Sequence, residues 1–161
     1  GLLQVEEYAR VVFEMWRPLL PEDTVNQRVA ARLARQELFS RTPMPTISFV
    51  IEESTLRRPL GGSAVMRAQL EQILLYGHQR NVEIQVMPTD RRQHAGMGGP
   101  FTLLETGKAQ RIAYVEVNEH SHLYSERPVV RGYEERYGIL RAQGLTPSES
   151  LAFVQKLLGD L

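Results

Sequence analysis

Two polar, glycine-containing loops carry the residues of this chain whose types are suited to binding an anion. One loop spans residues 56–62 and the other spans residues 89–100. Arginine presents a fork of donors that matches carboxylate and phosphate groups, and glycine lets the backbone approach a ligand closely. The competing interpretation is that both loops are ordinary turns whose arginines are solvated. The sequence predicts an anion or acidic-peptide site built from Arg57, Arg58, Arg91, Arg92 and His94.

A β-α-β unit is expected to position these two loops. Apolar residues alternate in residues 46–52 and again in residues 82–88, which is typical of strands. Between them, Ser63 is placed to cap a helix with one apolar face that ends near residue 77. Two strands joined in this way should be parallel, with a right-handed crossover. Both loops would then leave the same edge of the sheet, where ligands bind in open α/β sheets.

The other elements complete an α/β fold. Helical spacing predicts helices over residues 4–17, 23–40 and 129–142, and Thr146 opens a last helix with a capping-box pattern. Strands over 101–105 and 112–117 predict a hairpin, with a fifth short strand at 122–125. We expect a single domain over residues 1–161. Its fold class is α/β: a small mixed sheet with a right-handed β-α-β unit and a β-hairpin, flanked by N- and C-terminal helices.

Three other groups of residues have types that could do chemistry. Arg28, Arg32 and Arg35 share a face of the second helix, which could grip phosphates or acidic side chains or could simply be solvated. His94, beside a glycine loop, could act as a general base. His120 and His122, with Glu116 or Glu119 nearby, could hold a metal. The alternative function is therefore a metal-dependent hydrolase or phosphodiesterase-like enzyme using His94, His120 and His122.

Composition and charge narrow the function classes. The 161 residues include no cysteine, which excludes disulfides and thiol nucleophiles and fits a reducing, cytoplasmic location. No apolar run approaches the length of about 18 residues that a membrane span requires. The net charge is zero, whereas a self-sufficient nucleic-acid binder usually shows a basic excess. Phosphate-binding glycine motifs and common hydrolase motifs are also absent, so we expect no enzyme and no cofactor.

An ordered set of short stretches resembles the uncharacterised C-terminal domain of actinobacterial Xre-family helix-turn-helix transcriptional regulators. These stretches run through nearly the whole chain, and the ordered set carries the resemblance because no single motif is diagnostic. They include Leu56-Arg57-Arg58-Pro59-Leu60-Gly61-Gly62, Val82-Glu83-Ile84-Gln85-Val86-Met87-Pro88, Gly99-Pro100-Phe101-Thr102-Leu103-Leu104-Glu105 and Ser148-Glu149-Ser150-Leu151. A more remote likeness is to degenerate phospholipase D-like domains, whose His-x-Lys motif is absent here.

The resemblance implies the regulatory half of a transcriptional regulator. It implies that an N-terminal helix-turn-helix of the parent protein, absent from this chain, contacts DNA. It also implies a possible small protein partner encoded nearby, and it carries over no catalytic residues. We therefore expect a domain that binds a small anionic effector or a small protein partner, mediates dimerisation, or does both. A homodimer is expected because operators for helix-turn-helix proteins usually have two half-sites.

Overall fold

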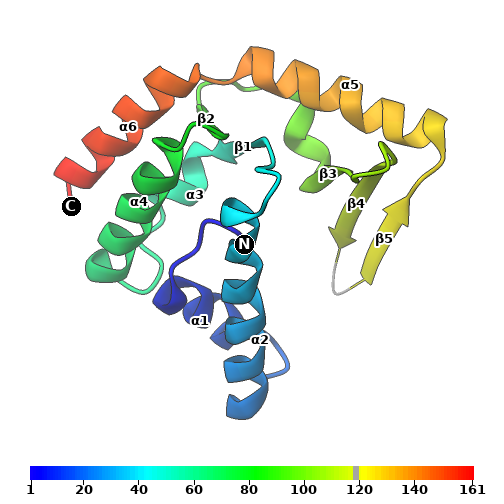
Figure 1. Ribbon diagram of the computed structural model, residues 1–161. Helices are drawn as coiled ribbons and strands as arrows, with labels where there is room; N and C mark the ends of the chain where they lie inside the picture. Colours follow the sequence, from blue (N-terminus) through cyan, green and yellow to red (C-terminus); the bar gives the residue numbers. More distant parts are fainter. Residues whose placement is uncertain (118–119) are drawn as a thin grey trace. The chain divides into compact units, whose positions relative to one another are not determined.

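The computed structural model describes residues 1–117 and 120–161, and these residues form two compact units. Unit 1 consists of Gly1–Val86 and Thr146–Leu161, and unit 2 consists of Met87–Leu145. Each unit has its own sheet and its own helices (Figure 1). The expectation of a single domain over 1–161 stays a prediction.

The described residues form six α-helices, two short 3-10 helices and five strands. The helices are α1 (Glu6–Glu14), α2 (Glu22–Ala34), η1 (Arg35–Ser40), α3 (Glu53–Arg57), α4 (Ser63–Gly77), η2 (Ala95–Gly98), α5 (Arg127–Gln143) and α6 (Pro147–Gly159). The strands are β1 (Ile47–Glu52), β2 (Val82–Met87), β3 (Phe101–Glu105), β4 (Arg111–Val117) and β5 (His120–Tyr124).

Unit 1 is organised around α4, which packs against both α1 and α6. Its buried residues repeat at helical spacing, with Met66 and Leu70 almost fully enclosed. The strands β1 and β2 form a parallel pair, and β2 is buried at every position except Glu83. A nearly continuous buried run is what a strand covered on both faces requires. The Ser150 hydroxyl of α6 accepts the Val86 N–H at 2.9 Å and ties this helix to β2.

The α1–α2 hairpin of unit 1 uses the predicted arginine face for packing. Its small core contains Phe13, Val25 and Val29. The Arg28 guanidinium carbon lies 4.8 Å from the Trp16 ring centroid, and that of Arg32 lies 4.2 Å from the Phe13 ring centroid. These distances are typical of cation–π contacts. Two of the three arginines therefore cover aromatic rings of their own hairpin.

Unit 2 is a three-stranded antiparallel sheet, in the order β3-β4-β5, with α5 packed on one face (Figure 1). The register pairs Leu103 with Ala113, and Ala113 with Tyr124. Aromatic rings join the sheet to the helix, since Phe101 contacts Tyr133 at 5.1 Å and Tyr124 contacts the same ring at 6.1 Å between centroids. This aromatic layer anchors α5, and with it the side chains on its first turns.

The expected α/β class, the β-α-β unit and the flanking helices are confirmed. The strands, however, are divided between two small sheets instead of sharing one mixed sheet. The prediction of a loop at Arg57 was wrong, because α3 ends at that residue. Ser63 is the first residue of α4 and not its cap, since Gly62 occupies the N-cap with a φ of 91° that favours glycine. The handedness of the crossover stays a prediction.

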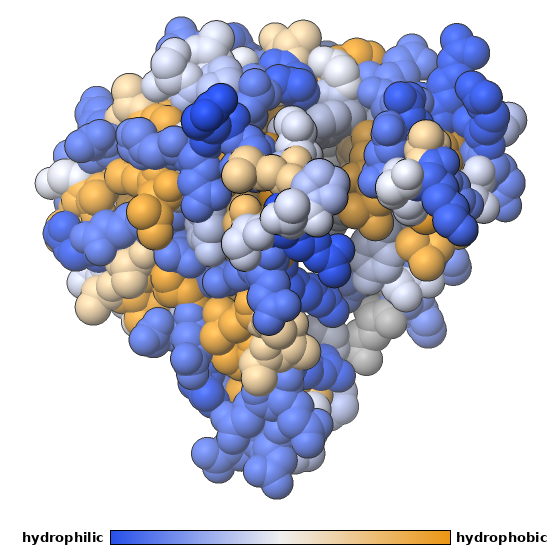
Figure 2. Space-filling model, in the orientation of Figure 1, coloured by the Kyte–Doolittle hydropathy of each residue, from blue (hydrophilic) through white to orange (hydrophobic). Residues whose placement is uncertain are grey.

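The surface is mostly hydrophilic, with hydrophobic residues reaching it in separate patches on the face drawn in Figure 2. Among the described residues, the most exposed large hydrophobic side chains are Met97, Leu19 and Leu123. A search of the helices in the described residues finds none that is long and apolar enough to cross a membrane.

Candidate anion-binding site

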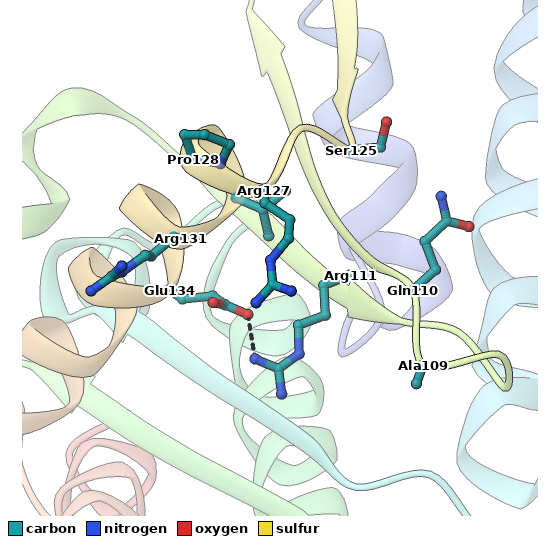
Figure 3. A pocket seen from close by; sticks show the side chains of 9 residues that line it. Ala109, Gln110, Arg111, Ser125, Arg127, Pro128, Arg131 and Glu134 are labelled. Atoms are coloured by element: carbon teal, nitrogen blue, oxygen red, sulfur yellow. Dashed lines mark hydrogen bonds and ion pairs between the residues drawn. The ribbon is translucent and has the colours of Figure 1, made fainter.

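A hollow of about 750 Å³ lies in unit 2, where the β3–β4 turn and the first turns of α5 meet (Figure 3). Three arginines, from two separate segments of the chain, contribute to its lining. We call it the arginine hollow. Its lining residues are Ala109, Gln110, Arg111, Ser125, Arg127, Pro128, Val130, Arg131 and Glu134.

The start of α5 is set by local sequence. Pro128 occupies the first turn of the helix, where its fixed φ is favourable and its missing N–H costs nothing. The helix therefore begins at Arg127, and Arg131 follows one turn later. Val130 is buried beneath this turn and holds it against the sheet. The two arginines are consequently carried on an anchored helix and not on a loop.

The opposite wall of the arginine hollow is the tight turn between β3 and β4. The Ala109 N–H donates to the Thr106 carbonyl at 2.8 Å, and the Thr106 N–H donates to the Gln110 carbonyl at 2.9 Å. Ala109 has a φ of 57°, a left-handed conformation that is costly for a residue with a side chain. This turn delivers Arg111 to the hollow as the first residue of β4.

Arg111 is held by two carboxylates. Its Nη1 donates to Glu134 Oε1 at 2.8 Å, and its Nε donates to Glu105 Oε2 at 3.0 Å. These hydrogen bonds, the one to Glu134 first, raise the pKa of Arg111 above its ordinary value. Figure 3 shows the Arg111–Glu134 pair as the link between β4 and α5. The positive charge of Arg111 is therefore largely balanced by these two carboxylates.

Arg127 and Arg131 differ from Arg111 because neither has an acidic partner in the described part of the chain. Both side chains are exposed. Figure 3 shows the Arg127 guanidinium directed toward the same space as that of Arg111, with the Glu134 carboxylate beside them. Glu126, just before the helix, accepts the Ser125 N–H at 3.2 Å. The Arg131 guanidinium is directed away from those of Arg111 and Arg127 (Figure 3), so the common space is shared by these two groups and the Glu134 carboxylate.

The predicted site residues of the first loop belong to unit 1. The Arg57 Nε donates to Glu53 one helical turn earlier, and its guanidinium carbon lies 5.3 Å from the Phe153 ring centroid. Arg58 is exposed at the end of α3. Burial raises the pKa of the Tyr8 hydroxyl, and the charge of Arg58 partly opposes that shift. Arg57 therefore has partners within its own unit.

The predicted residues of the second loop belong to unit 2. The Arg91 Nε donates to the Gln143 carbonyl at 3.2 Å, so this cation stabilises the C-terminal end of α5. The Nδ1 of His94 accepts a hydrogen bond from the Gly96 N–H at 3.1 Å, so His94 caps the N-terminus of the short helix η2. Arg92 is exposed. Since Arg57 and Arg58 lie in the other unit, the joint site of all five residues stays a prediction.

The proposed histidine cluster is only partly assembled. The register places His122 opposite Val115 and Ser121 opposite Glu116, so Glu116 and His122 occupy opposite faces of the sheet. The Glu116 carboxylate instead accepts the Tyr114 hydroxyl at 3.0 Å. Glu119 lies outside the described residues. Within 1–117 and 120–161, no group of three or more potential metal ligands lies together.

Sequence reasoning missed the arginine hollow for two reasons. The helix was expected to begin at residue 129, which placed Arg127 outside it. Residues 112–135 also contain five acidic residues against two arginines, so the charge along the chain indicates an acidic segment there. The only two basic residues of that acidic segment are Arg127 and Arg131. One sequence signal could have located these residues. Pro128 is typical of the first turn of a helix, and it predicts that Arg127 and Arg131 lie one turn apart at the start of that helix.

The fold and this site together define an α/β protein with a cationic hollow on its antiparallel unit. The chain belongs to the family described as "Domain of unknown function (DUF5753)", whose family model matches residues 1–156. No curated protein and no solved structure matches the chain.

Proposed function

We propose that this DUF5753 domain is the regulatory domain of a DNA-binding transcriptional regulator and that it responds to an anionic effector. The observation that carries the proposal is the arginine hollow, where Arg127 and Arg131, which have no acidic partner within residues 1–117 and 120–161, accompany Arg111. An anion is the chemical species that such a cluster would hold. The resemblance to the C-terminal domains of actinobacterial Xre-family regulators supports the regulatory role.

In this proposal, DNA is contacted by an Xre-type helix-turn-helix in another part of the parent protein. The zero net charge of this chain supports a separate DNA-binding domain, since a domain that bound DNA by itself would need a basic surface. The parent protein is cytoplasmic and acts as a homodimer on two half-sites. A small protein partner encoded nearby is the other input that the resemblance implies.

The mechanism would be thermodynamic linkage. A ligand that binds one conformation or oligomer better than another shifts the DNA affinity by the same free energy, typically about 1–3 kcal/mol. Helix α5 is suited to carry such a signal within unit 2. Its first two turns contribute Arg127 and Arg131 to the lining of the hollow, while its last turn receives the Arg91 side chain. A ligand at one end would bias an element that is anchored along its length.

Chromatin immunoprecipitation of the tagged parent protein, in its own host, tests this function. The wild type should occupy discrete DNA sites, and the Arg127→Gln/Arg131→Gln double variant should change their occupancy or its response to growth conditions. Arg67→Gln/Arg80→Gln is the matched control, because it removes two exposed arginines of unit 1 with the same change in charge. The function would be refuted by a parent protein that occupies no discrete sites, or by a double variant indistinguishable from the control.

A further inference from the structure

We propose that the outer edge of β5 is an interface for a second copy of this chain, which adds its own β5 as an antiparallel neighbour and joins the two antiparallel sheets into one. This inference locates the self-association that the proposed function includes, and it is tested without DNA. The backbone groups, the composition and the exposed side chains of β5 support this pairing.

The outer edge of β5 presents backbone donors and acceptors to a further strand. β5 is the last strand in the order β3-β4-β5 and pairs with β4 (Figure 1). Within residues 1–117 and 120–161, no backbone hydrogen bond joins His120–Tyr124 to any other segment. The register with β4 sets one residue opposite one residue along the whole strand, so no bulge twists this edge away. A regular strand with an open edge is a template for pairing with another chain.

β5 lacks the features that usually protect an exposed edge. Its sequence, His-Ser-His-Leu-Tyr, contains no proline, lysine, arginine, aspartate or glutamate. The other edge strand of this sheet, β3, differs, because Pro100 precedes it and Glu105 ends it in an ion pair with Arg111. Charged residues and prolines at an edge discourage pairing with another chain. β5 is therefore the edge of this sheet that favours association.

A two-fold symmetric pair is the arrangement that fits β5. Two identical edges related by a two-fold axis run antiparallel, and the same surface then serves both copies. With His122 on the axis, every residue of the strand finds a partner, since His120 lies opposite Tyr124 of the second copy and Ser121 lies opposite Leu123 of the second copy. No acidic side chain, lysine or arginine lies opposite its own copy in this register, so the repulsion that like charges cause across a strand pair is avoided.

Pairing would also cover side chains that a single chain leaves exposed. The first four residues of β5 are exposed, and Leu123 is 69% exposed although it lies opposite Tyr114 on β4. Leu123 alternates with Tyr124, whose ring stacks on Tyr133 of α5, so Leu123 lies on the sheet face opposite to α5. In the symmetric register, Leu123 and its copy are diagonal neighbours on that face, where long side chains reach each other.

Charge-swap variants at His122 test the pairing with the 161-residue chain alone. His122→Asp and His122→Lys each place like charges opposite each other at the two-fold axis, so each variant should self-associate about tenfold more weakly than wild type, or weaker still. An equimolar mixture of the two variants should recover association, because aspartate then lies opposite lysine. Sedimentation equilibrium over a concentration series that reaches about 1 mM measures the dissociation constants.

Thr102→Asp and Thr102→Lys are the matched controls, because Thr102 is an exposed residue of β3, the other edge strand. They introduce the same charges and should leave self-association unchanged, both alone and mixed. Amide hydrogen exchange of the wild type adds a backbone measurement that needs no substitution. Exchange in residues 120–124 should slow severalfold as the protein concentration rises, whereas exchange in residues 101–105 should not change.

The inference is overturned if the wild-type chain stays monomeric throughout the series, or if residues 120–124 gain no protection as the chain associates. It is also overturned if the mixed His122 variants associate no better than each alone, or if the Thr102 variants weaken association equally. A monomeric wild type would leave the proposed response to an anion in place, because a parent protein can dimerise through another of its parts. Association through β5 in a parent protein that occupies no discrete DNA sites would keep this interface and refute the proposed regulatory function.

Discussion

Replacing Arg127 by glutamine should stabilise the ligand-free protein. This residue occupies the first position of α5, has Arg131 four residues later and has no acidic partner in the part of the chain described. Removing a cation from a helix N-terminus is worth about 0.3–1 kcal/mol, and removing a like-charged i, i+4 pair is worth about 0.2–0.5 kcal/mol. Helix propensity changes little, since arginine and glutamine are similar helix formers.

The two contributions sum to about 0.5–1.5 kcal/mol. For a chain of this size, each kcal/mol shifts Tm by about 2–4 °C, so differential scanning calorimetry at low ionic strength should show a rise of about 1–6 °C. The rise should shrink in about 1 M salt, where the screening length falls to about 3 Å. A variant that is less stable than wild type at low salt would refute the electrostatic reasoning.

Arg67→Gln is the matched control for this stability measurement. Arg67 lies near the start of α4, as Arg127 lies at the start of α5, but an acidic residue, Glu71, follows it by one turn. The same substitution there removes a cation that has an opposite charge, not a like charge, four residues later, so Tm should stay unchanged or fall slightly. Equal stabilisation by both substitutions would show that the effect reports on net charge and not on the arginine hollow.

Three further predictions concern the scaffold. Ser150→Ala leaves the buried Val86 N–H without this acceptor and should cost about 1–3 kcal/mol in urea unfolding. Thr146→Ala removes the capping box of α6 and should cost about 0.5–2 kcal/mol at pH 7. Hydrogen bonds from Thr146 lower the pKa of Glu149 in the folded state, so this stabilisation is present above the unfolded pKa near 4.3 and is lost as the pH falls through the folded pKa. The deficit of Thr146→Ala should therefore shrink below about pH 4, and a deficit independent of pH would contradict it. Ala109→Gly relieves a left-handed φ of 57° and should gain up to about 1 kcal/mol, whereas a loss would show that the turn is not strained.

Most elements of the fold could be predicted because their signals are local. The apolar periodicity of α4, the alternation in β1 and β2 and the capping box at Thr146 all depend on neighbouring residues, and their bounds agree closely with prediction. The helix α3 could not be predicted in this way, because five residues without a side-chain cap carry little periodicity. The division into two sheets depends on long-range pairing, which alternation within a strand does not specify.

The candidate site was less accessible to sequence reasoning, because charge along a chain does not map onto charge in space. The arginine hollow joins the β3–β4 turn to the start of α5, and Glu134 and Glu105 are both paired with Arg111. Conversely, conspicuous cations such as Arg91 and Arg57 are engaged in local contacts that stabilise their own units. Only the folded structure shows which guanidinium groups have partners within the protein and which have no acidic partner among the described residues.

Native mass spectrometry of residues 1–161, captured with a tag from the lysate of the native host, tests the central claim most directly. The account predicts an adduct of a few hundred daltons on the wild type, which is absent from Arg127→Gln/Arg131→Gln and retained by Arg67→Gln/Arg80→Gln. An adduct that persists in the double variant, or a wild-type chain that carries no small molecule, would contradict the account.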